Sequence, residues 1–191
     1  MTIKLHRFAL FTMLLGVFAG CVPSWNPLYT DKDLVFDPQL VGTWKGDEGE
    51  TWKFEKSSDK KYKLVYTDGE GKATFVAHLL KINDRQFLDL FLHDSAAEDM
   101  KMNALAKATI LPVHLFFRVD EIGTSLKMAV VNPGWLEEHI QANPKATPHL
   151  KQEDRVVLTG SPLELQAFVL QHAEGEALFG SPFTLKRESA K

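Results

Sequence analysis

Several features that often reveal the class of a protein are scarce or absent in this sequence. Only one cysteine, Cys21, occurs in 191 residues, so no disulfide can form within the chain and the apolar core must hold the fold. The formal net charge is −3, and this mild acidity argues against binding to nucleic acid or to anionic lipid headgroups. No internal repeat is visible, and the apolar run from Phe8 to Phe18 is shorter than the roughly 20 residues of a membrane-spanning helix.

The first 21 residues, by contrast, have the three regions of a secretory signal peptide. Lys4 and Arg7 form a basic start, the uncharged apolar run follows, and the small residues Ala19 and Gly20 lead into Cys21. A basic region, a short apolar region and a small-residue cleavage site, in this order, are typical of exported proteins. We therefore predict a signal peptide over residues 1–20.

The segment Val17-Phe18-Ala19-Gly20-Cys21 also resembles the lipobox of bacterial lipoproteins. The resemblance implies that the Cys21 thiol is diacylated, that the preceding peptide is removed, and that the new amino terminus receives a further acyl chain such as palmitate. Two or more acyl chains anchor a protein stably in a membrane. In well-studied lipoproteins an aspartate after the cysteine retains the protein in the inner membrane. Here Val22 takes that place, which implies an outer-membrane anchor with the protein facing the periplasm.

The composition of the remaining chain is that of one folded domain. Hydrophobic residues make up 45% of the sequence and charged residues 25%, which excludes a largely disordered protein. Prolines forbid a continuous helix in residues 21–33, where we predict a lipidated tether. Trp25, Leu28 and Tyr29 indicate that part of this tether lies against the body. Residues 34–191 are predicted to form a single domain.

An alternation of apolar and polar residues dominates the first half of this domain. Thr51 to Lys56 places Trp52 and Phe54 on one face, which predicts a strand with one buried and one solvated side. Ala73 to Ile82 is apolar on both faces apart from His78. Further strands are predicted over residues 41–45, 61–66, 86–92, 113–119, 125–131 and 155–159. The predicted fold class is mainly β, an antiparallel barrel or highly curved sheet of about eight strands, since closure would remove exposed edges.

Two or three helices are predicted among these strands. Ser95 and Glu98 have the spacing of a capping box and begin a helix that extends to Ala108. Pro133 opens a second helix through Ala142, and residues 161–173 form a third that starts at a Ser-Pro pair. The pattern leaves open whether the helices cap the barrel or flank it.

Gly42-Thr43-Trp44, on the first predicted strand, resembles the Gly-X-Trp signature of lipocalins. The order strand, Ser-Pro, helix, strand at the end of the chain is similar to the end of a lipocalin. The resemblance implies an eight-stranded barrel in which Trp44 plugs the closed end and a basic residue, Arg187, stacks on it. The alternative interpretation is that Trp44 is an ordinary core aromatic residue that follows a turn glycine.

Aromatic residues of the early strands are candidates for a ligand-binding site. They are Trp52, Phe54, Tyr62, Tyr66 and Phe75, and all would line the interior if these strands curl into a barrel. A barrel of eight strands either is filled by its own side chains or holds one small ligand. The segment with Met100 and Met102 would be a lid over the open end or a helix packed on the wall.

The dispersed histidines are the candidates for chemistry. His78, His93 and His114 lie on neighbouring predicted strands and could converge on one metal ion, but ordinary hydrogen bonds are the commoner role and no pair has local ligand spacing. Asp89 and His93 share a strand face and could form an acid–base pair. Because no nucleophile accompanies them, we predict neither enzyme activity nor a metal or other cofactor.

The sequence therefore predicts a non-enzymatic envelope lipoprotein that binds a small apolar molecule, such as a lipid or fatty acid, inside its barrel. This function requires a cavity of several hundred cubic ångströms. The alternative is a protein-interaction module, either an envelope assembly factor or an enzyme inhibitor, with a filled barrel and an exposed apolar patch. Metal-dependent hydrolysis at the histidines is a third hypothesis.

Overall fold

The computed structural model describes residues 21–93, 103–107, 109, 111–152 and 155–189. In chain order the elements are β1 (Leu34–Val35), η1 (Pro38–Leu40), β2 (Gly42–Lys45), β3 (Thr51–Ser58), β4 (Lys61–Thr67), β5 (Lys72–Ile82), β6 (Arg85–Leu92), α2 (Ala104–Lys107), β7 (His114–Ile122), β8 (Ser125–Val130), α3 (Pro133–Ala142), β9 (His149–Gln152), β10 (Arg155–Leu158), α4 (Pro162–His172) and β11 (Phe183–Arg187). None of the described helices is long and apolar enough to cross a membrane. Most of the predicted helix from Ser95, with Met100 and Met102, lies outside the described residues.

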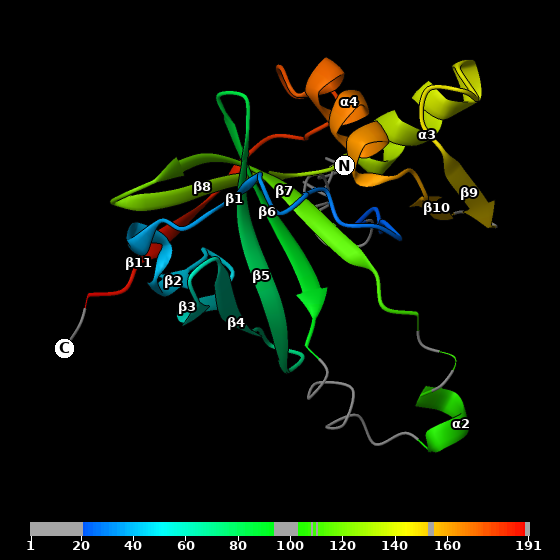
Figure 1. Ribbon diagram of the computed structural model, residues 1–191. Helices are drawn as coiled ribbons and strands as arrows, with labels where there is room; N and C mark the ends of the chain where they lie inside the picture. The colour runs from blue at the N-terminus through cyan, green and yellow to red at the C-terminus, as the bar shows by residue number, and fades with distance from the viewer. Residues whose placement is uncertain (1–20, 94–102, 108, 110, 153–154, 190–191) are drawn as a thin grey trace, which may run out of the picture.

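Eight of the strands form a closed antiparallel barrel (Figure 1). Neighbouring strands follow the order β2-β3-β4-β5-β6-β7-β8-β11, and β11 closes the ring on β2 with Arg187 opposite Trp44. The additional strand β1 pairs with β5, with Leu34 opposite Leu80. The predicted fold class, a mainly β antiparallel barrel of about eight strands with helices, is confirmed.

The two ends of the barrel differ in their connections. Short turns join β3 to β4, β5 to β6 and β7 to β8 at one end, which we call the closed end, and η1 leads into β2 there. The long connections, from β6 to β7 and from β8 to β11, leave from the other end, which we call the open end. The open end therefore holds both long connections together with the short turns from β2 to β3 and from β4 to β5.

Large apolar side chains from every barrel strand pack together in the interior. The predicted alternation holds, because Trp52 and Phe54 are 2% and 1% exposed while Lys53 between them faces solvent. The other buried members of this inner cluster are Leu40, Trp44, Tyr62, Leu64, Ala77, Leu79, Leu88, Leu90, Phe117, Val119, Leu126, Met128 and Leu185. The interior toward the closed end is therefore a filled core.

A second apolar core lies outside the barrel, on the wall formed by β5 to β8. Outward-facing residues of this wall, such as Leu80 and Phe116, pack against α3 and α4 through side chains such as Leu136 and Phe168. Figure 1 shows the two helices together on one side of the barrel. This cover explains why β5 is apolar on both faces, and it shows that the helices flank the wall.

The segment of residues 22–33, which we call the strap, is part of the folded domain. The backbone of Ser24 exchanges two hydrogen bonds with His114 on β7, of 2.9 and 2.8 Å. Trp25 N–H donates to the Leu158 carbonyl on β10 at 2.8 Å, so the strap joins the barrel to the β9–β10 ribbon. Leu28 is fully buried in the second core. The segment predicted to be a tether therefore lies against the body over most of its length.

Candidate functional site

The closed end carries the contact that the lipocalin resemblance implied. The Arg187 guanidinium lies 4.1 Å above the Trp44 ring, and the Trp44 indole N–H donates to the Leu40 carbonyl at 2.9 Å. Arg187 also donates to the carbonyls of Val41, at 2.9 Å, and Gln39. A side chain on Gly42, whose φ is +142°, would collide with the Arg187 guanidinium, so glycine is required there. This end is closed by the packing of Trp44, Leu40 and Arg187.

The five predicted ligand-binding residues lie at two levels of the barrel. Phe54 and Tyr62 are deep in the core, where the Tyr62 hydroxyl accepts from the backbone N–H of Asp37 at 2.7 Å and donates to its carbonyl at 3.0 Å. Trp52, Tyr66 and Phe75 lie nearer the open end, and the last two are only partly buried. The structure thus assigns Phe54 and Tyr62 to the packed core and leaves Trp52, Tyr66 and Phe75 as candidates for ligand contact.

Several aromatic rings besides Phe54 lie next to Trp52. The ring centroids of Tyr66, Phe117 and Phe183 lie 5.2, 5.7 and 6.2 Å from that of Trp52. The sequence analysis did not select Phe117 and Phe183, because only the pairing order of the strands brings β7 and β11 close to β3. Phe183 remains partly exposed, so an apolar surface at the open end is continuous with the inner core.

Two buried polar atoms in this region have no hydrogen-bond partner among the described residues. They are the indole Nε1 of Trp52 on β3 and the carboxylate Oε2 of Glu50, which precedes β3 and lies against Gly46 in the turn from β2. A buried donor or acceptor without a partner costs about 1–3 kcal/mol. The Trp52 donor lies among aromatic rings and is a candidate contact for a ligand, and the Glu50 acceptor lies at the same end of the barrel, in the turn from β2 to β3.

A second polar cluster lies under the strap, on the outer face of the wall. Asp89 on β6 is fully buried, and its Oδ1 lies 2.7 Å from Nδ1 of His114 on β7. Its other oxygen accepts from the backbone N–H of Leu28 at 3.0 Å. Burial raises the pKa of Asp89 above its usual range, against the opposing effect of the His114 hydrogen bond. Asp89 therefore ties β6, β7 and the strap together.

Two further rings complete this cluster. The ring of Tyr29 on the strap lies 4.6 Å from that of His78 on β5. Burial and the Asp89 charge raise the pKa of Tyr29 to about 12. Burial, Lys61 and His114 lower the pKa of His78 to about 4, and its buried Nδ1 has no partner among the described residues. His78 is therefore held in its neutral form beneath the strap.

We expect this burial to make the strap sensitive to acid. The unfolded chain takes up the His78 proton near pH 6.5 and the folded chain only near pH 4, so stability is full above pH 6.5 and falls as the pH drops toward 4. The expected loss between pH 7 and pH 5 is about 2 kcal/mol. Urea unfolding at both pH values should show this loss in the wild type but not in His78→Leu. An equal loss in both proteins would assign it to a group other than His78.

The predicted pairing of Asp89 with His93 is wrong. Strand register places Phe91 opposite His114, so that His114 lies diagonally across from Asp89, whereas His93 follows the end of β6. His78 and His114 do share one cluster with Asp89, but no group of three or more His, Cys, Asp or Glu in the described ranges is arranged to hold a metal ion.

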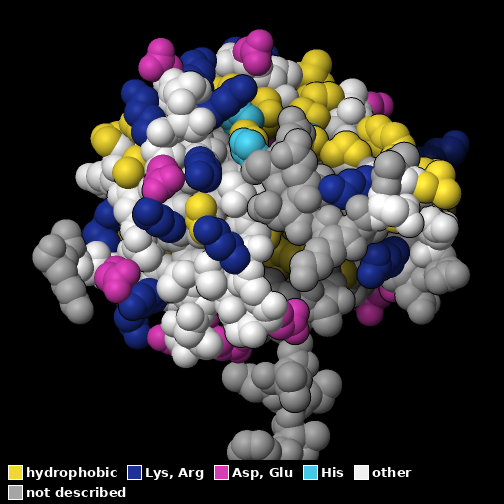
Figure 2. All heavy atoms as spheres, turned by 90° about the horizontal axis from the view of Figure 1, so that it is seen from below, with side chains coloured by type: hydrophobic (Ala, Val, Ile, Leu, Met, Phe, Trp, Pro, Cys, Tyr) yellow, Lys and Arg dark blue, Asp and Glu magenta, His cyan; other side chains and the backbone are white. Residues whose placement is uncertain are grey.

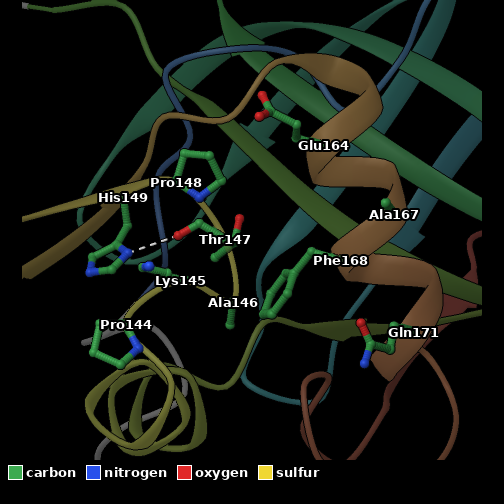
Figure 3. A pocket seen from close by; sticks show the side chains of 10 residues that line it. All are labelled: Pro144, Lys145, Ala146, Thr147, Pro148, His149, Glu164, Ala167, Phe168 and Gln171. Atoms are coloured by element: carbon green, nitrogen blue, oxygen red, sulfur yellow. Dashed lines mark hydrogen bonds between the residues drawn. The ribbon is translucent and has the colours of Figure 1, made fainter.

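A surface hollow of about 520 Å³ lies between residues 144–149 and α4 (Figure 3). Its lining mixes Lys145, His149 and Gln171 with the apolar ring of Phe168. The Thr147 hydroxyl is buried there and has no hydrogen-bond partner among the described residues. The backbone carbonyl of Thr147 lies 2.9 Å from Nδ1 of His149. The hollow is open to solvent and outside the barrel, and its mixed lining selects no chemical class of ligand.

Comparison with protein-family models, with curated proteins and with solved structures finds no match for this chain.

Proposed function

We propose that this chain is an outer-membrane lipoprotein, anchored through acylated Cys21 and facing the periplasm, whose barrel binds a small amphiphilic molecule at its open end. The resemblance to a lipobox supports the anchor. The eight-stranded barrel, which is consistent with a lipocalin-like fold, supports the binding role. The observation that carries the proposal is the buried, unpartnered indole N–H of Trp52 inside an aromatic surface.

The two unpartnered atoms indicate the chemistry of the ligand. Trp52 offers a donor and Glu50 an acceptor, and a hydroxyl group, which both donates and accepts, can pair with either. A fatty-acid carboxylate would meet the like charge of Glu50, so the proposed ligand is a neutral lipid, such as a monoacylglycerol, rather than a fatty acid. Because the core toward the closed end is filled, the ligand contacts only Trp52, Tyr66, Phe75 and their neighbours near the open end. This role needs no catalytic group.

Native mass spectrometry of a soluble chain that begins at Val22 tests the proposal. We expect an extra mass of a few hundred daltons that appears in the organic phase after denaturation and extraction. Monoacylglycerol should then bind more tightly than the fatty acid of equal chain length. Trp52→Phe, which keeps an aromatic ring but removes the donor, should weaken monoacylglycerol binding roughly five- to tenfold, the value of one hydrogen bond.

Matched variants separate this site from general apolar binding. Glu50→Gln should reduce the preference for the neutral lipid, and Trp135→Phe, on α3 outside the barrel, should change neither affinity. A protein that is isolated without ligand, and stays so after incubation with both lipids, would overturn the proposed binding. The protein-interaction hypothesis, with partners in the envelope, would then take its place.

A further inference from the structure

The structure leaves no flexible linker between the proposed lipid anchor and the folded domain. Ser24 is fully buried and hydrogen-bonded to β7, and Trp25 is hydrogen-bonded to β10. Cys21 is three residues before Ser24, so the two lie within about 11 Å of each other even if the chain between them is fully extended. Acyl chains on Cys21 would therefore hold this part of the domain directly against the bilayer.

The surface next to Cys21 is unusually apolar. Trp25 is 50% exposed, Leu150 on β9 is 59% exposed and Leu163 in the first turn of α4 is 61% exposed. They are three of the five large hydrophobic side chains exposed in the described ranges, and the others, Leu105 and Leu111, belong to the connection between β6 and β7.

Strand pairing places these side chains on a common face. Ser24 lies opposite Leu158, and both are buried, so the alternation of the chain turns Trp25 to the other side of the ribbon. Leu150 lies opposite Val157, the residue before Leu158, and therefore shares the side of Trp25.

The first turn of α4 joins the same surface. The Asn26 side chain donates to the Gly160 carbonyl at 2.9 Å, which brings the turn that carries Leu163 next to the strap. Figure 2, seen from below, shows hydrophobic side chains on the right-hand part of the molecule, where α2 as well as β9 and β10 lie in Figure 1.

We propose that Trp25, Leu150 and Leu163 form a docking face that inserts into the membrane interface beside the acyl chains of Cys21. The inference rests on the anchor of the proposed function and deepens it, because it fixes how the domain is oriented on the membrane. Tryptophan favours this interface, since its ring is apolar and its N–H is polar. Without residues 1–20, which hold Lys4 and Arg7 and no acidic residue, the net charge becomes −5, so the contact depends on apolar insertion and should change little with salt.

The test uses the full chain, expressed in a Gram-negative bacterium, purified from its membranes and reconstituted in phosphatidylcholine vesicles that contain brominated lipid. Intact mass spectrometry first establishes whether Cys21 is acylated. Bromine quenches tryptophan only at contact distance, so we expect strong quenching in the wild type and at least a threefold reduction in Trp25→Phe. The matched variant Trp135→Phe should retain the quenching.

A second variant tests the face as a unit. Leu150→Ser, an exposed position on another strand, should reduce the quenching of Trp25 at least twofold while leaving the circular dichroism spectrum unchanged. An acylated protein whose quenching is the same in the wild type and in Trp25→Phe would overturn the docking face and leave the anchor standing. An unmodified Cys21 would overturn the anchor, and the docking face with it.

Discussion

Replacement of Asp89 with alanine is expected to lower the free energy of unfolding by roughly 2–5 kcal/mol, the cost of leaving two buried polar groups without a hydrogen-bond partner. The side chain is fully buried, accepts from the Leu28 N–H and lies 2.7 Å from His114. Its loss leaves the buried Leu28 N–H without an acceptor and Nδ1 of His114 without its partner. Chemical unfolding followed by circular dichroism measures the change, and hydrogen exchange at Leu28 should rise because the strap loses its contact with β6.

Two variants serve as controls for this result. Asp47→Ala removes a carboxylate that pairs with Lys186 at 3.0 Å on the surface, and it should change stability by less than about 1 kcal/mol. Asp89→Asn keeps the size of the side chain and an acceptor for Leu28, so it should cost less than the alanine substitution. If Asp89→Ala costs no more than Asp47→Ala, the cluster does not hold the strap.

Local patterns were sufficient to predict most of the barrel. Alternation places Trp52 and Phe54 inside the barrel because a strand with one solvated face must present every second residue to the core. Pro133 after the capping residue Asn132, whose side chain accepts from the Trp135 N–H, marks the start of α3 at the predicted residue. The ribbon strand β9 was not predicted, because most of its residues are exposed and polar, so the sequence shows no apolar alternation there.

The candidate sites depend on contacts between distant segments, and these were predicted less well. No local pattern shows that an irregular segment with two prolines pairs with both β7 and β10, so the strap was predicted to be a tether. The partner of Asp89 is set by the register between β6 and β7 across a long connection, which spacing along one strand cannot reveal. One signal was available, since β5 is apolar on both faces and such a strand must be covered on its outer side.

Replacement of Trp44 with alanine should be as damaging as the loss of Asp89, at roughly 3–5 kcal/mol. Trp44 is fully buried between the inner core and Arg187, and its indole N–H donates to Leu40 in η1. The substitution leaves a large cavity at the closed end and frees η1 from β2. Thermal and urea unfolding followed by circular dichroism measure the loss. Trp25→Ala, the same substitution at a half-exposed position, should cost about 1 kcal/mol or less in the absence of membranes.

A double-mutant cycle separates the two roles of Arg187 at this end. Its guanidinium stacks on Trp44 at 4.1 Å and also donates to the carbonyls of Val41 and Gln39. If stacking contributes as a cation–π contact should, Trp44→Leu and Arg187→Ala will show a coupling energy of about 1 kcal/mol. A coupling near zero, with Arg187→Ala still destabilising, would mean that the arginine acts only by joining η1 to β11 through the two carbonyls. In that case Trp44 closes the barrel by its volume alone, and Trp44→Phe should recover most of the stability that Trp44→Ala loses.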